Sequence, residues 1–194
     1  MPGRDPMRLQ GSCAALAAAL VLTCAAAWAG PAQTSAASEP AVWVPKVLTF
    51  TYRGFTTRYT CDGLRTKVKN YLLELGARPD LEVRAWGCTQ PVAPDVFPGV
   101  SVQMNVLQPA ASAAQAVTAH WKRVDLLANR SPLDAAADCE LISQVKLNIL
   151  PLFTARNVDY QATCSRGQMQ PGATRLAADV LVADSSAATA SPSR

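Results

Sequence analysis

Two tryptophan–cysteine pairs with the same spacing constrain the fold of this chain more than any other feature. Trp43 precedes Cys61 by 18 residues, and Trp121 precedes Cys139 by the same interval. Each of these cysteines opens a helix-like stretch, which leads to a second cysteine and then to a Pro-Gly pair. Self-similarity at a fixed offset is typical of an internally duplicated chain. The sequence therefore predicts two units of one kind. They span residues 43–109 and 119–183.

Residues 1–29 have the order of a secretory signal peptide. Arg4 and Arg8 precede an apolar run at 14–27, and small residues around Trp28 supply a cleavage site after Ala29. The run is shorter than the ~20 residues that span a bilayer, so cleavage is favoured over an uncleaved anchor. We therefore expect a periplasmic or secreted protein with no transmembrane segment after signal cleavage.

A lipoprotein signal that ends at Cys24 is the alternative. Such sites resemble a small residue followed by cysteine, whereas Thr23 stands at that position here. Lipid anchoring at Cys24 is therefore disfavoured.

The cysteines that remain after signal removal predict two disulfides. Cys13 and Cys24 leave with the signal, and an even number of cysteines in an exported chain is typical of a disulfide framework. Four cysteines allow three connectivities, of which pairing within each unit is the simplest. The expected bonds are Cys61–Cys88 and Cys139–Cys164. No C-x-x-C motif indicates a redox or metal site.

Local patterns in the first unit predict strands and one helix. Residues 47–53 and 55–60 are typical of two strands of a hairpin around Gly54. A helix is expected from Cys61 to Gly76, because apolar residues recur at three- and four-residue steps and glycine fits the left-handed position at a helix end. Two further strands are expected at 81–88 and 100–107.

The second unit shows the same order. A strand at 119–128 precedes a helix that starts at Ser131, with proline in its first turn, and Pro151 should end that helix near Leu150. Strands are expected at 158–164 and 175–182. The predicted class is α+β, with tandem strand(s)–helix–strand–strand units, helices on one face of a mostly antiparallel sheet, and one disulfide in each unit.

The flanking and linking segments are poor in large apolar residues. Ala, Ser and Pro dominate them, so they bury too little surface to offset the entropy of ordering. We expect a disordered linker at 30–42, a second linker at 110–118 and a disordered tail at 184–194.

The charge balance of the exported chain is mildly basic. Removal of Arg4, Arg8 and Asp5 leaves 16 Lys and Arg against 13 Asp and Glu. This balance favours solubility and gives no indication of nucleic-acid binding. A cluster of basic residues at the first helix is a candidate contact for an anionic surface component. It comprises Arg58, Arg65, Lys67 and Lys69.

The tryptophans Trp43, Trp86 and Trp121 are the other candidates for a contact surface or a ligand pocket. In units with small cores such residues more often serve packing, and the sequence leaves both interpretations open.

Catalytic patterns are weak. The chain has no nucleophile motif, phosphate-binding loop, dinucleotide-binding motif or zinc-binding helix motif, and His120 is its one histidine. Asp134, Asp138 and Glu140 gather at the start of the second helix, where acids favour the helix dipole. Asp134 and Asp138 are the pair that would share a metal. We therefore assign no catalytic residue, metal ligand or cofactor.

Several short segments carry a resemblance to a known group. The segments are Tyr59-Thr60-Cys61-Asp62-Gly63-Leu64, Leu75-Gly76-Ala77-Arg78, Gly87-Cys88 and, in the second unit, Pro132-Leu133-Asp134 through Cys139-Glu140-Leu141. The pattern resembles functionally uncharacterised, hypothetical exported proteins of Gram-negative bacteria. The resemblance implies an envelope or secreted location and brings no catalytic residues.

Two functions follow from these observations. The first is a non-enzymatic binding module of the bacterial envelope, whose partner is an envelope protein or an anionic surface component. The second is a hydrolase-like or metal-assisted enzyme that uses His120 with Asp134 or Asp138. The enzyme needs those side chains to converge in one cleft.

Overall fold

The computed structural model describes the chain between residues 38 and 184. The described residues are 38–54, 58–89, 94, 96–110, 114–127, 135–162 and 174–184. All of them belong to one compact unit, Ser35–Arg194. The expected signal peptide, Cys24, Ser131, Asp134, Cys164 and most of the expected tail lie outside the described residues.

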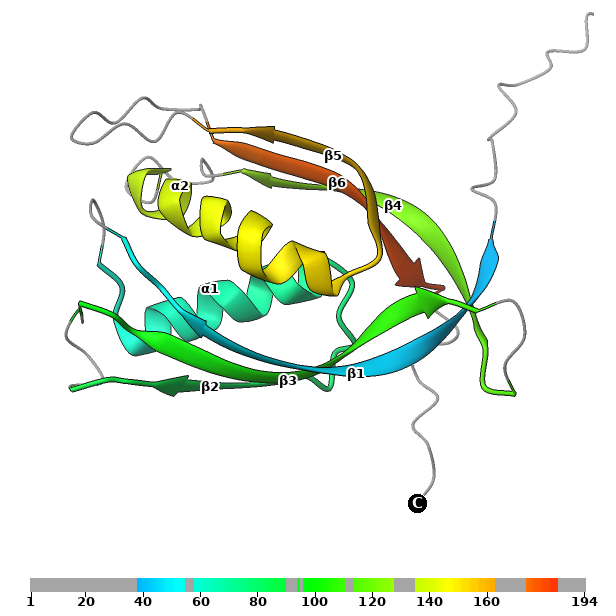
Figure 1. Cartoon of the computed structure of the whole chain (residues 1–194), viewed down its shortest axis with the longest axis horizontal. Helices are drawn as coiled ribbons and strands as arrows, with labels where there is room; N and C mark the ends of the chain where they lie inside the picture. Colours follow the sequence, from blue (N-terminus) through cyan, green and yellow to red (C-terminus); the bar gives the residue numbers. More distant parts are fainter. Residues whose placement is uncertain are drawn as a thin grey trace, which may run out of the picture. The chain divides into compact units, whose positions relative to one another are not determined.

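A six-stranded antiparallel sheet and two main helices form the fold (Figure 1). The elements in chain order are β1 (Glu39–Thr51), α1 (Cys61–Glu74), β2 (Glu82–Trp86), β3 (Gly99–Pro109), β4 (Val117–Leu127), α2 (Ala135–Gln144), β5 (Ala155–Gln161) and β6 (Arg175–Ala183). The strand order in the sheet is β2-β3-β1-β4-β6-β5. The predicted α+β class with an antiparallel sheet is therefore confirmed, and both predicted units contribute to one sheet.

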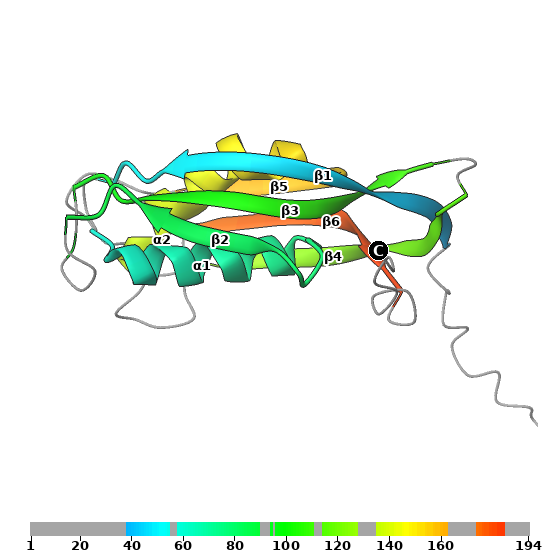
Figure 2. The same ribbon diagram turned by 90° about the horizontal axis from the view of Figure 1, so that it is seen from below.

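The sheet consists of two arms that meet at a short junction. We call β2-β3-β1 the first arm and β4-β6-β5 the second arm. β1 pairs with β3 from Ala41↔Pro109 to Thr51↔Gly99, but with β4 only from Glu39↔Ala119 to Ala41↔Val117. Beyond the junction the arms diverge, and α1 and α2 lie between them (Figure 1). Figure 2 shows the first arm in front of β5 and β6, with α1 along its lower side.

The predicted hairpin around Gly54 is wrong. β1 is one long strand that pairs with β3, and Tyr52 continues this ladder by donating its N–H to the carbonyl of Pro98. Residue Thr60 forms only an isolated bridge with Pro94, and residues 55–57 lie outside the described residues. Local β propensity in 47–53 marks a real strand, but the partner is distant in sequence.

The strands also extend into segments that were expected to be linkers. β1 begins at Glu39, inside the expected linker 30–42, and β4 begins at Val117, inside 110–118. Ala41 and Ala119 are fully buried in the sheet junction. Their small side chains allow this close packing, which a composition-based expectation of disorder misses.

Helix α1 has the expected start and end. Thr60 is its N-cap, and the Thr60 Oγ1 accepts a hydrogen bond from the Gly63 N–H at 3.0 Å. Gly76 adopts φ +94°, the left-handed conformation predicted for the residue after the helix. The buried residues of the helix are Cys61, Leu64, Val68 and Leu72.

Helix α2 continues into a π-helical turn at Val145–Ile149 and a 3₁₀ turn at Leu150–Leu152. Pro151 has no N–H to donate, so regular α-helix cannot pass through it. The α-helix itself ends at Gln144, before the predicted end near Leu150, and the helical backbone continues past that point to Leu152. Apolar residues of this helical segment face the core. Leu141, Ile142, Val145 and Ile149 are fully buried.

The main core lies between the helices and the inner face of the sheet. Alternation places every second residue of each strand on this face. The largest fully buried residues of this core are Tyr52, Leu64, Leu72, Leu75, Leu126, Leu141, Ile142, Ile149 and Leu176.

A smaller core covers the junction on the outer face of the sheet. Its buried centre consists of Ala41, Leu107, Ala119 and Leu181, with Trp43 and Trp121 packed against it. Each tryptophan is covered by an arginine. The Cζ of Arg78 lies 5.8 Å from the centroid of Trp43, and that of Arg156 lies 3.9 Å from the centroid of Trp121.

The two halves of the described chain, residues 38–110 and 114–184, share their element order and an equivalent backbone hydrogen bond. Each half runs strand–helix–strand–strand. The N–H of Ala110 donates to the carbonyl of Pro40 at 3.0 Å, and the N–H of Asp184 donates to the carbonyl of Thr118, also at 3.0 Å. Pro40 and Thr118 occupy the same position at the junction, one from each arm.

Candidate functional site

A polar cluster joins the two helices inside the fold. Asp138 of α2 is only 6% exposed. Its Oδ1 accepts hydrogen bonds from the Tyr59 hydroxyl at 2.9 Å and from the Lys67 Nζ at 2.6 Å, and its Oδ2 lies 2.8 Å from the same Nζ. The Tyr52 hydroxyl donates to Glu140 at 3.1 Å. The rings of Tyr52 and Tyr59 meet edge to face, with centroids 4.8 Å apart.

The electrostatics of this cluster keep both phenols protonated. Burial raises the pKa of Tyr59 above its ordinary value, and the negative charge of Asp138 raises it further. Burial, together with the charge of Glu140, raises the pKa of Tyr52 in the same way. Protonated phenols act here as hydrogen-bond donors and not as bases. The cluster therefore ties α1 to α2, and it presents no activated nucleophile.

The four predicted basic residues do not form one surface. Lys67 points to Asp138 with 26% of its side chain exposed, whereas Arg65 pairs with Asp62 at 3.2 Å on the opposite side of α1. Arg58 and Lys69 are exposed. The structure thus separates Lys67, which joins the helices, from Arg58, Arg65 and Lys69, which remain available to solvent.

His120 lies far from the acids with which the sequence associated it. Its Nδ1 lies 2.5 Å from the Oδ1 of Asp184, and both side chains are about one-third exposed. Asp138 lies near the opposite end of β4, because the adjacent Cys139 contacts Thr174 at 2.6 Å. The seven residues of β4 between His120 and that end correspond to roughly 23 Å. The structure does not bring His120 and Asp138 together, and Asp134 lies outside the described residues.

The three candidate tryptophans have different environments. Trp43 and Trp121 are partly buried beneath arginines on the outer face, where they pack the junction. Trp86, at the end of β2, is 42% exposed. Its indole covers the backbone of Gly99, where any Cβ would overlap the ring. Trp86 is thus the one member of this predicted set that offers a large apolar surface to solvent.

Two further exposed apolar side chains lie just before the start of β3, whose first residue, Gly99, pairs with Trp86. Val96 is 52% exposed and Phe97 is 59% exposed. Gly87 is the residue after Trp86. A Cβ on Gly87 would lie 3.5 Å from the carbonyl oxygen of Phe97, so the backbone after β2 and the backbone before β3 lie side by side. We call Trp86, Val96 and Phe97 the aromatic end. The sequence indicates Trp86 as a candidate but not Val96 or Phe97, although their position just before Pro98-Gly99 is typical of an exposed turn.

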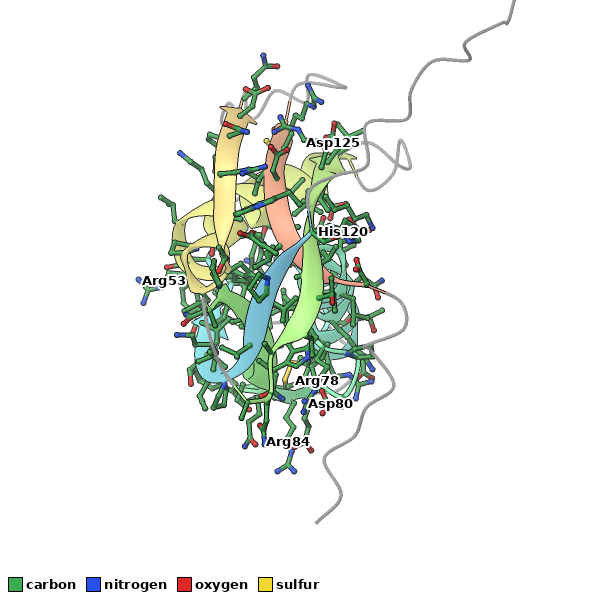
Figure 3. The ribbon with its side chains drawn as sticks, turned by 90° about the vertical axis from the view of Figure 1, so that its right-hand side faces the viewer. Arg53, Arg78, Asp80, Arg84, His120 and Asp125 are labelled. Carbon is green, nitrogen blue, oxygen red and sulfur yellow. A yellow bond between two sulfur atoms is a disulfide. The ribbon has the colours of Figure 1, made fainter. Side chains whose placement is uncertain are left out.

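A shallow hollow of about 280 Å³ lies on the outer face of the first arm. It is lined by Pro45, Lys46, Val47, Asp80, Glu82, Gln103, Met104 and Asn105. Asp80 accepts two hydrogen bonds from Arg78, at 2.8 and 2.6 Å, and these lower the pKa of Asp80. Figure 3 shows Arg78 and Asp80 together and Arg84 projecting away from the ribbon. Asp80 is paired with Arg78 and Glu82 with Arg84. Because both acids of the lining are paired, the hollow has no clear ligand preference.

Other site types find little support within the described part of the chain. No group of three His, Cys, Asp or Glu side chains there is arranged to hold a metal ion. In the same part, no helix is long and apolar enough to cross a membrane.

The structure describes both cysteines of the first half but only one cysteine of the second half. Cys61 and Cys88 form the predicted disulfide, with their Cα atoms 6.2 Å apart. Cys139 is also disulfide-bonded. Its expected partner Cys164 lies outside the described residues, so that pairing stays a prediction.

Comparison with protein families, with curated proteins and with solved structures found no match to this chain.

Proposed function

We propose that the protein is an exported, disulfide-stabilised binding module of the bacterial envelope, built from two copies of one strand–helix–strand–strand unit. In this proposal the module has no catalytic activity and acts through the aromatic end. The signal-like residues 1–29, the bond between Cys61 and Cys88, and the resemblance to exported Gram-negative proteins support the exported location.

The paired arginines and tryptophans support the duplication. Arg78 follows Trp43 by 35 residues, and Arg156 follows Trp121 by the same 35. In both halves the guanidinium lies over the indole of that tryptophan. An identical side-chain arrangement at an identical spacing is difficult to explain by composition alone. One bond within each unit, Cys61–Cys88 and Cys139–Cys164, follows from the same proposal.

The exposure of the aromatic end is the observation that carries the binding function. Large apolar side chains that gather on a surface mark interaction sites more often than isolated ones do. Trp86, Val96 and Phe97 are all exposed and lie near the ends of β2 and β3, and the bond at Cys88 holds the end of β2 to the start of α1. The polar cluster and His120, by contrast, satisfy their own hydrogen bonds inside the protein.

Retention of the protein in a washed envelope fraction tests this proposal. The variant Trp86→Ser/Phe97→Ser removes the aromatic end, and Val47→Ser/Leu147→Ser removes two apolar side chains that are 75% and 67% exposed elsewhere. We expect the first variant to lose retention and the second to keep it. Equal retention of both variants would remove the aromatic end as the working surface. Mass spectrometry of the exported material should find Gly30 as its first residue.

A further inference from the structure

We propose that the aromatic end enters the headgroup region of a phospholipid bilayer and that the surrounding basic residues favour anionic lipids there. This inference rests on the proposed function, because it names the partner of the same surface. Tryptophan is well suited to such a boundary, since its ring is apolar and its N–H remains able to donate to water or headgroups.

The size of the aromatic end favours a bilayer over a protein partner. An aromatic side chain offers about 150–250 Å² in total, and here only 42% of Trp86, 52% of Val96 and 59% of Phe97 is exposed. Together they present roughly 250–300 Å². A stable protein interface needs about 800 Å² from each partner. Three side chains are thus too few to form such an interface on their own, but they can supply one of the two signals that stable membrane anchoring takes.

The attachment of the aromatic end to helix α1 is also consistent with a bilayer as its partner. The three residues lie where β2 and β3 approach their connection, next to the start of α1. The disulfide at Cys88 and the bridge between Thr60 and Pro94 fasten this hairpin to the helix start. A surface fastened in this way loses little conformational entropy when it enters a soft interface.

The charges around the aromatic end supply the second signal. Arg84 lies two residues before Trp86 on the same side of β2, with 71% of its side chain exposed. Arg58 precedes the bridge at Thr60, and Arg65 and Lys69 follow on the exposed face of α1. The described acids nearby are Asp62, paired with Arg65, and Glu82, paired with Arg84. Asp95, outside the described residues, adds one acid. Arg58 and Lys69 are therefore the residues that we assign to anionic headgroups.

Vesicle co-sedimentation tests the inference with the chain from Gly30 onward. The vesicles contain phosphatidylcholine alone or with about 30 mol% phosphatidylglycerol, at low salt. We expect binding to the anionic vesicles, and a decrease in partition of about tenfold or more for Trp86→Ser/Phe97→Ser. Arg58→Gln/Lys69→Gln should weaken binding to the anionic vesicles alone. The matched control Val47→Ser/Leu147→Ser should bind as the parent does.

Fluorescence of Trp86 supplies a second readout. In a Trp43→Phe/Trp121→Phe background, Trp86 is the remaining tryptophan of the exported chain, and its emission should shift to shorter wavelength on addition of anionic vesicles. No vesicle binding, or binding that survives Trp86→Ser/Phe97→Ser unchanged, would overturn the bilayer inference. If envelope retention still depends on the aromatic end in that case, the binding module stands and its partner is a protein.

Discussion

The Nζ of Lys67 lies 2.6 Å from the Oδ1 of Asp138, although 71 residues separate them in the chain. This ion pair crosses from α1 in the first half to α2 in the second half. The hydroxyl of Tyr59 shares the same carboxylate oxygen. The pair is therefore part of the contact that holds the two helices in register between the arms.

Removal of one partner of this pair should destabilise the fold strongly. Asp138→Ala leaves the ammonium of Lys67 and the hydroxyl of Tyr59 without their acceptor in a buried site. We expect a decrease of about 3 kcal/mol in the free energy of unfolding, measured by urea denaturation. Arg65→Ala, which breaks the exposed pair with Asp62, is the matched control and should cost less than about 1 kcal/mol. Similar costs for both variants would show that the buried pair does not join the helices.

The raised pKa of Tyr59 predicts that the free energy of unfolding decreases at alkaline pH. Its folded-state pKa is raised above the ordinary value of 10.0, so the folded protein holds this proton more tightly than the unfolded chain does. The stabilisation is complete below about pH 10 and decreases as the pH rises above it. Tyr59→Phe should make this alkaline decrease shallower, although its stability at neutral pH is lower. Urea denaturation at a series of pH values from neutral to alkaline measures both effects, and an unchanged slope would contradict the assignment.

The two disulfides give a prediction that peptide mapping can check. Without reductant, digestion should release Cys61 linked to Cys88 and Cys139 linked to Cys164. Cys61→Ala/Cys88→Ala opens a loop with a sequence separation of 27 and should cost up to about 3.5 kcal/mol on the chain-entropy estimate. A link between Cys139 and any cysteine other than Cys164 would contradict the pairing within units.

Gly76 should not tolerate a side chain. Its φ of +94° is unfavourable for other residues, and an added Cβ would lie 3.0 Å from the Val182 Cγ1 and 3.1 Å from the Leu181 carbonyl oxygen. We expect Gly76→Ala to lower the free energy of unfolding by about 1 kcal/mol or more. Gly87 also has positive φ, but its nearest atom is at 3.5 Å, so Gly87→Ala should cost less. Thermal denaturation of the two variants compares the costs directly.

The elements that the sequence predicts well are those whose signals are local. Helix α1 depends on its own apolar stripe, on the cap at Thr60 and on Gly76, all within a few residues of the helix. Strand β3 shows strict alternation, with Val100, Val102 and Met104 buried. Pro151 marks the region where the helical segment after α2 stops, although α2 itself ends at Gln144.

The features that the sequence does not predict depend on partners far along the chain. β1 lacks a nearby partner, so its pairing with β3 cannot be inferred from residues 47–60. Lys67 has the same charge as Lys69, and only the position of Asp138 distinguishes a helix-joining lysine from a solvated one. The contact of Arg78 with Trp43 was accessible in principle, because the same spacing recurs at Arg156 and Trp121.

Ala119 pairs with Glu39 on one side and with Ala183 on the other. The first and last strands of the described chain therefore end two strand spacings apart, roughly 10 Å. The chain passes from the end of β3 at Pro109 to the start of β4 at Val117, and β1 lies between these two strands in the sheet. A connection of similar length would carry it from β6 past β4 to β1 and close the backbone into a ring. We expect a circular permutant that is cut between β3 and β4 and joined between β6 and β1 to keep the same strand order in the sheet.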